Sequence, residues 1–121
     1  LSMNKAIVGV GINLQTPYIE NTEQSISSLG QLGLAPIDRL TLIAELYNAI
    51  QQAAQWFDHG SYHLAERFNH HAIWLDHQVV LEHHQGKVQG IFHGISQDGA
   101  VLIETDTLQA FYQGRLRLAA H

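Results

Sequence analysis

The chain has 121 residues, of which 45% are hydrophobic and 14% are charged. This balance predicts one folded domain, or two very small ones, and excludes an intrinsically disordered chain. No apolar run approaches the roughly 18 residues that cross a bilayer, which excludes an integral membrane helix. No secretory signal is visible, so a cytoplasmic location is expected. The absence of cysteine excludes a disulfide framework, thiolate metal sites and cysteine nucleophiles.

The charge balance argues against a nucleic-acid partner. Eleven Asp and Glu residues against six Lys and Arg residues give a formal net charge of -5. A protein that binds a phosphate backbone normally carries a basic stripe, whereas here the basic residues are spread along the sequence and only Arg115 and Arg117 are close neighbours. We therefore do not expect this chain to bind nucleic acid by itself.

The first predicted element is residues 5–14 (KAIVGVGINL), an almost wholly apolar run that is typical of a strand buried on both faces of a sheet. Residues 15–28 are polar, contain Pro17 and predict a loop. Nothing earlier in the chain can supply neighbours for such a strand. We therefore interpret the sequence as the C-terminal part of a larger protein.

A long helix is predicted to begin at Pro36, which suits the first helical position, and to stop at Gly60. Asp38 would lie in its first turn, where a carboxylate interacts favourably with the helix dipole. The helix should bury one apolar stripe, because apolar residues recur every three or four positions: Leu40, Ile43, Ala44, Tyr47, Ile50, Ala54 and Phe57.

A shorter helix and a group of strands follow. The helix is expected over residues 62–69, with its apolar side chains turned inward (Leu64, Ala65 and Phe68). Beyond residue 76 the apolar residues alternate, which indicates strands. Five short strands within about forty residues predict a small, bent antiparallel barrel of SH3-like size, and the fold class is α+β. The strands are expected at residues 79–82, 87–95, 100–104, 110–112 and 115–118.

The candidate ligand site is the glycine pair of the first strand. Gly9 and Gly11 are two residues apart, so they leave one face of the strand without side chains. Another backbone or a flat ligand can approach such a face closely. Asn13 follows on the same side and offers a donor and an acceptor to a polar group. Packing against a crossing helix explains the glycines equally well on the sequence alone. The third glycine of a dinucleotide fingerprint is absent.

Other residues give weaker signals. Gly90 and Gly94 are expected to permit the sharp bending of the barrel. His59 and His63 have the spacing of a helical zinc pair, but Gly60 and Ser61 should break that helix. The remaining histidines are interpreted as surface residues, so no metal site is expected. Neither a Ser-His-Asp arrangement nor a pair of carboxylates can be argued from spacing, and no catalytic residue is predicted in this chain.

The order of the motifs resembles the C-terminal part of a biotin–protein ligase. The similar segments are VGVGINL, then ISSL, then a long helix, then GIFHGISQDGAVLIE and a closing YQGRLRL. The resemblance implies that residues 4–76 are the end of the ligase catalytic domain and that residues 77–119 are its SH3-like C-terminal domain. It also implies an activity: biotin and ATP, with Mg2+, form biotinoyl-5'-AMP, and biotin is then transferred to a lysine of a carboxylase carrier domain, such as that of acetyl-CoA carboxylase.

The resemblance carries over to particular residues. Gly9 and Gly11 would face the biotin–adenylate, Asn13 would lie near the adenine, and residues 15–26 would form a loop over the nucleotide. The family's adenylate loop and its catalytic lysine are absent from this sequence, so the chain alone should be inactive. Family members often end in Gly-Glu-(apolar)-Ser-Leu-Arg, whereas here Arg115 replaces the acidic residue and Ala119 the final arginine. Some relatives also carry a DNA-binding domain and repress transcription.

Two other functions stay open at this point. One is a stand-alone SH3-like module with a helical prefix that binds a protein or peptide, although only Phe92, Phe111 and Tyr112 could supply the aromatic groove. The other is a histidine-based metal carrier. In addition, a first strand without sheet neighbours leaves unpaired N–H and C=O groups, which predicts self-association through that edge.

Overall fold

The computed structural model describes residues 5–20, 22, 25–33 and 38–120. The chain divides into two compact units, Leu1–Ile50 and Gln51–His121, and each is described by itself. The predicted helix start at Pro36 lies outside the described residues. Among the residues described, neither helix has both the length and the apolar character that a membrane span requires.

Helix α1 spans Arg39–Phe57, and Asp38 caps its N-terminus. The Asp38 carboxylate accepts hydrogen bonds from the Thr41 hydroxyl at 2.7 Å and the Thr41 backbone N–H at 3.3 Å. These two bonds, the hydroxyl first, hold the pKa of Asp38 below its ordinary value. The prediction that Asp38 lies in the first turn is therefore corrected by one position: it precedes the helix and satisfies a free N–H group as an N-cap residue.

The predicted burial of the apolar stripe of α1 is wrong for this chain. No residue of the helix is buried, and Leu40, Tyr47 and Phe57 are 76%, 60% and 75% exposed. The amphipathic pattern determines which face of a helix is apolar, but burial also requires a surface to pack on. The described part of Leu1–Ile50 contains no second helix or strand that could provide one.

A left-handed turn separates α1 from α2, which spans Leu64–His71. Gly60, Ser61, Tyr62 and His63 have φ of 82°, 58°, 37° and 54°, so the second helix begins two residues later than predicted and the helix break between His59 and His63 is confirmed. Arg67 stabilises this turn because its guanidinium donates hydrogen bonds to the backbone carbonyls of Tyr62 (2.8 Å) and Ser61 (3.0 Å).

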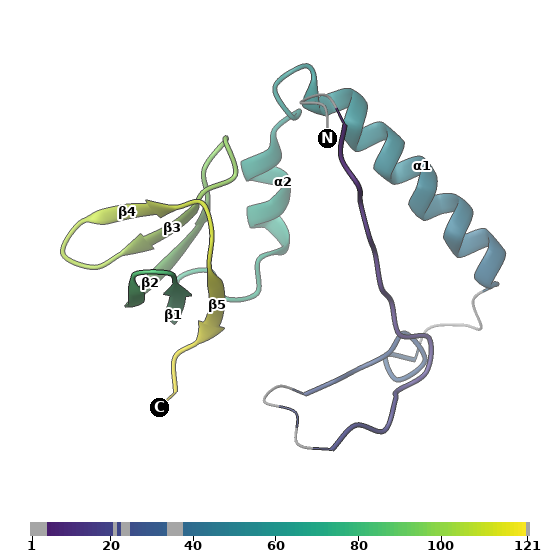
Figure 1. The fold of residues 1–121 in the computed structure, drawn as a ribbon, viewed down its shortest axis with the longest axis horizontal. Coiled ribbons are helices and arrows are strands. Elements are labelled where there is room, and N and C mark those ends of the chain that lie inside the picture. Colours follow the sequence, from purple (N-terminus) through teal and green to yellow (C-terminus); the bar gives the residue numbers. More distant parts are fainter. Residues whose placement is uncertain (1–4, 21, 23–24, 34–37, 121) are drawn as a thin grey trace. The chain divides into compact units, whose positions relative to one another are not determined.

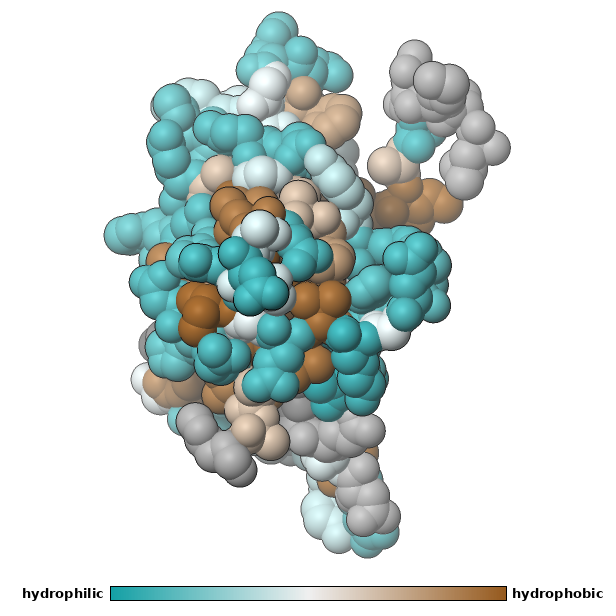
Figure 2. All heavy atoms as spheres, turned by 90° about the vertical axis from the view of Figure 1, so that its left-hand side faces the viewer, coloured by the Kyte–Doolittle hydropathy of each residue, from teal (hydrophilic) through white to brown (hydrophobic). Residues whose placement is uncertain are grey.

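The five predicted strands are confirmed and form one antiparallel sheet in the order β4-β3-β2-β1-β5 (Figure 1). The ladders leave β4 and β5 at the two edges, so the sheet is open and the closure of an SH3-like barrel is not confirmed. Seen from the side that carries the sheet, hydrophilic side chains predominate and apolar ones show as separate patches (Figure 2). The strands are β1 Gln78–His83, β2 Gly86–Ile95, β3 Val101–Glu104, β4 Leu108–Phe111 and β5 Arg115–Leu118.

The sheet has one buried face. Val79 and Leu81 of β1, Phe92 of β2 and Ile103 of β3 form its core cluster, and all four side chains are at most 4% exposed. Val79 and Leu81 are two residues apart and therefore point to the same face. Burial of this face supplies the main driving force for folding of the sheet.

Two glycines allow close approaches to β2, whereas the bending that was predicted for them as part of barrel closure is not confirmed in the open sheet. A Cβ at Gly90 would lie 2.2 Å from the backbone oxygen of Glu104, so β2 and β3 could not pair as closely. Gly94 has φ of 83°, and a Cβ there would lie 2.2 Å from Oδ1 of Asn69. Asn69 uses this space to bind the backbone of Ile95, accepting from its N–H at 2.9 Å and donating to its C=O at 3.3 Å. This pair of bonds fixes α2 against β2.

Candidate functional site

Residues 5–13 run as an extended segment without a hydrogen-bonded ladder to any described residue (Figure 1). Ile7, Val8 and Val10 are 90%, 59% and 55% exposed, so the described residues do not bury this segment, and the predicted burial of its two faces stays a prediction. An extended apolar segment becomes a buried strand only when neighbouring strands pair with it. The described part of the chain provides none.

The two glycines of this segment leave open space beside the backbone. A Cβ at Gly9 or at Gly11 would have no atom within 4 Å among the described residues. This differs from Gly90 and Gly94, where neighbouring atoms occupy that space. No described residue therefore packs at the notch between Gly9 and Gly11.

Asn13 anchors the end of the segment. Its side-chain amide donates a hydrogen bond to the backbone carbonyl of Ser27 at 3.2 Å, and its backbone carbonyl accepts one from the N–H of Leu29 at 3.0 Å. The next carbonyl, that of Leu14, accepts from the N–H of Gly30 at 3.1 Å. These bonds join the end of the glycine segment to residues 27–30.

A small polar cluster supports the loop after Asn13. Ser28 is 5% exposed, and its hydroxyl lies 2.9 Å from the Thr16 hydroxyl and accepts the N–H of Gln31 at 3.1 Å. Thr16 also donates to the side-chain carbonyl of Gln31 at 2.9 Å. This cluster could not be predicted from the sequence, because Ser, Thr and Gln are common throughout residues 15–31 and their spacing has no distinctive pattern. The cluster positions the loop that the resemblance assigns to the nucleotide.

Histidines do not converge on a metal site in the described residues, where no group of three or more His, Asp or Glu side chains could hold an ion. His93 comes nearest to such a group. Its Nε2 lies 2.5 Å from a carboxylate oxygen of Glu104, and its Nδ1 lies 3.8 Å from one of Asp76. The two carboxylates lie at opposite nitrogens of the ring, so the three side chains form a row rather than a group around one point.

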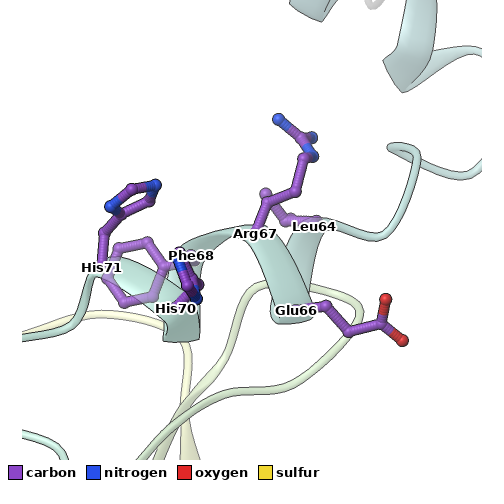
Figure 3. A pocket seen from close by; sticks show the side chains of 6 residues that line it. All are labelled: Leu64, Glu66, Arg67, Phe68, His70 and His71. Atoms are coloured by element: carbon purple, nitrogen blue, oxygen red, sulfur yellow. The ribbon is translucent and has the colours of Figure 1, made fainter.

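A shallow groove runs along the exposed side of α2 (Figure 3). All of its lining residues belong to this one helix, and Phe68 is 46% exposed. The prediction that Phe68 turns inward is therefore wrong, and Leu64 and Ala65 are only half-buried. Asn69 makes the specific contact of α2 with the sheet, so the apolar residues of this helix are free to line the groove. The lining residues are Leu64, Glu66, Arg67, Phe68, His70 and His71.

The aromatic groove of a stand-alone SH3-like module is not assembled in the sheet. Phe92 is 4% exposed and belongs to the core, whereas Tyr112 is 72% exposed and donates a hydrogen bond to Asp98 at 2.7 Å. Peptide grooves of such modules require several exposed aromatic rings side by side. The structure offers no specific support for this alternative.

The fold that carries these features is an α+β arrangement of two helices and an open five-stranded antiparallel sheet. The same fold occurs in biotin protein ligase from Aquifex aeolicus. The structure of that ligase in complex with biotin and ATP has a TM-score of 0.78 and 20% sequence identity, and the match covers 89% of this chain and 48% of the ligase chain. Its apo structure has a TM-score of 0.76 and 19% identity, with 89% and 50% coverage.

The comparison confirms the predicted resemblance at the level of the fold, and the chain spans about half the length of the ligase chains it matches. The sequence matches no protein-family model and no curated protein. The assignment of Gly9, Gly11 and Asn13 to a ligand stays a prediction, and so do the domain limits at residues 76 and 77.

Proposed function

We propose that this chain is part of a biotin–protein ligase. In the proposed reaction the biotin carboxylate attacks the α-phosphate of ATP, which gives biotinoyl-5'-AMP and releases pyrophosphate. A lysine amine of a carboxylase carrier domain then attacks the acyl carbon, which forms an amide and releases AMP. The fold shared with a ligase that binds biotin and ATP supports this proposal.

The open notch at Gly9 and Gly11 is the observation that carries the proposal. No atom of the described chain lies within 4 Å of a Cβ placed at either glycine. An extended backbone without side chains on one face lets a flat or narrow ligand reach within hydrogen-bonding distance of the main chain. Asn13, held by the backbone of Ser27 and Leu29, would present its side-chain oxygen at the end of this notch. Biotin and adenine both have the shape and the polar edges for such a site.

The chain contributes binding groups but no catalytic group in this proposal. The resemblance assigns the catalytic lysine and the adenylate loop to sequence that this chain does not contain. The described residues also offer no set of metal ligands, so we assign none of them to Mg2+. The 121-residue chain alone should therefore form no biotinoyl-5'-AMP.

The test is an assay of the full-length protein that contains this chain. Purified protein, biotin, ATP and Mg2+ are incubated with the unmodified carrier domain of an acetyl-CoA carboxylase, and biotin transfer is followed by mass spectrometry. We expect one biotin per carrier, dependent on ATP, and no transfer to a carrier whose target lysine is replaced by arginine. The 121-residue chain serves as the inactive control. A folded full-length protein without turnover would overturn the assignment.

A further inference from the structure

Three polar residues that follow Asn13 form a closed ring of hydrogen bonds. The backbone N–H of Gln31 donates to the Ser28 hydroxyl at 3.1 Å, and the Thr16 hydroxyl donates to the side-chain carbonyl of Gln31 at 2.9 Å. The Thr16 and Ser28 hydroxyls lie 2.9 Å apart. Because the single hydroxyl proton of Thr16 is directed to Gln31, the Ser28 hydroxyl donates to the Thr16 oxygen. We call Thr16, Ser28 and Gln31 the hydroxyl ring, since its bonds begin and end at Gln31.

The hydroxyl ring contains the most buried residue of its unit. Among the residues that the structure describes in Leu1–Ile50, only Ser28 is buried, at 5% exposure. Burying a hydroxyl is unfavourable unless the group is hydrogen-bonded, and Ser28 both donates and accepts. The apolar side chains nearby are exposed, as Tyr18 at 87% and Ile19 at 55% illustrate. The local structure therefore depends on hydrogen bonds more than on apolar burial.

The hydroxyl ring holds residues 27–31 against residues 13–16, and this contact includes Asn13. The N–H of Leu29 donates to the backbone carbonyl of Asn13 at 3.0 Å, and the Asn13 side-chain amide donates to the carbonyl of Ser27 at 3.2 Å. Asn13 is thus held at its backbone and at its side chain by one short segment. The hydroxyl ring ties the same segment to the chain three residues beyond Asn13.

We propose that the hydroxyl ring positions Asn13 for nucleotide binding at the end of the notch between Gly9 and Gly11. This inference rests on the proposed function, in which the resemblance assigns Asn13 to the adenine of ATP. Thr16 and Ser28 act through Asn13 and are positioning residues. A binding group that is already held in place loses less freedom when the ligand arrives. The hydroxyl ring should therefore strengthen nucleotide binding and leave the chemical step unchanged.

The test compares Thr16→Val with Thr16→Ser in the full-length protein. Valine has nearly the shape of threonine but no hydroxyl, so it breaks two bonds of the hydroxyl ring, whereas serine retains the hydroxyl. Ser28→Ala breaks the hydroxyl ring from its other side. Thr107→Val is the matched control, because it makes the same change at an exposed position just before β4 in the other unit.

Two measurements are made on each variant. Hydrogen exchange followed by mass spectrometry reports the protection of residues 27–31. Biotin-dependent exchange of pyrophosphate into ATP gives kcat and the KM values for ATP and for biotin.

We expect Thr16→Val and Ser28→Ala to lower the protection of residues 27–31. Both variants should raise KM for ATP by about fivefold, the effect expected for about one lost hydrogen bond. The KM for biotin and kcat should change by less than about twofold. Thr16→Ser and Thr107→Val should retain the values of the unmodified protein.

The KM values separate positioning from stability alone. A hydroxyl ring that only stabilises the fold would reduce the active fraction, and hence kcat, with an unchanged KM for ATP. That result in Thr16→Val would overturn the inference and leave the ligase assignment intact. Unchanged protection of residues 27–31, equal rises in both KM values, or an equal effect in Thr16→Ser would also overturn it. Absence of pyrophosphate exchange in the folded, unmodified protein would defeat the proposed function itself, and this inference with it.

Discussion

The two units of this chain both contain apolar segments, but the apolar side chains are buried in one unit and exposed in the other. In Gln51–His121 the alternating apolar residues of the strands form a core whose central members, Val79 and Ile103, are fully buried. In Leu1–Ile50 the glycine segment and the part of the α1 stripe that lies in this unit are also apolar but exposed, as Ile7 at 90% and Ile43 at 56% illustrate. Local pattern determines which face of an element is apolar, and only neighbouring elements determine whether that face is buried.

The largest effect should come from core truncation. Ile103→Ala removes buried methyl groups from the centre of the sheet and should lower the free energy of unfolding by about 2–5 kcal/mol. Ile43→Ala makes the same chemical change on the exposed face of α1. This variant should change the free energy of unfolding by less than about 0.5 kcal/mol. Urea unfolding followed by circular dichroism measures both variants. Equal losses would mean that the stripe of α1 is buried in solution.

A second comparison uses the glycines. Gly94→Ala should destabilise the sheet by about 1–3 kcal/mol, because the methyl group would overlap Asn69 and the left-handed backbone is strained for alanine. Gly99→Ala has a similar φ of 87° and open space, so it isolates the backbone contribution. Gly9→Ala should not change the stability of the fold measurably, apart from the difference in backbone propensity between glycine and alanine. Thermal unfolding measures the stability of the three variants. An equal loss of stability in Gly9→Ala and Gly94→Ala would contradict the difference between the two sites.

The smallest effect concerns one exposed carboxylate in each unit. Hydrogen bonds from Ser96 and Tyr112 hold the pKa of Asp98 below its ordinary value, as those from Thr41 do for Asp38. A lowered pKa means that the stabilisation is complete above the unfolded pKa and is lost as pH falls through the folded value. The protection of amides near Thr41 and Ala100 against hydrogen exchange, measured relative to the unfolded chain at the same pH, should therefore fall below about pH 4.

For the corresponding control, Asp38→Asn retains a capping oxygen without the charge, so it should abolish the pH dependence at Thr41 and leave that at Ala100 unchanged. Loss of both dependences together would show that the two sites titrate as one, contrary to their separation into different units.

The elements of this fold were largely predictable from the sequence, because each depends on local signals. Turn residues such as Asp98 and Gly99 and the alternation around Leu116 and Leu118 located all five strands. The start of α2 was missed because Ser61, Tyr62 and His63 adopt positive φ, which their residue types do not favour. This turn is stabilised by hydrogen bonds from Arg67, which follows it in the sequence, so the residues of the turn alone do not indicate its conformation.

The candidate site was predictable only in part. The glycine spacing indicated an open strand face, and the structure shows open space at Gly9 and Gly11. The burial of that strand could not be judged, since it depends on neighbouring strands and the described residues provide none.

The most direct test of the central claim fills the notch and measures adenylate formation. In the full-length protein, Gly11→Val places a side chain into the space assigned to the ligand, and Ala6→Val adds comparable bulk to an exposed position of the same segment. We expect Gly11→Val to abolish biotin-dependent pyrophosphate exchange without lowering the free energy of unfolding, while Ala6→Val retains the exchange. Full exchange activity in a folded Gly11→Val protein would contradict the account.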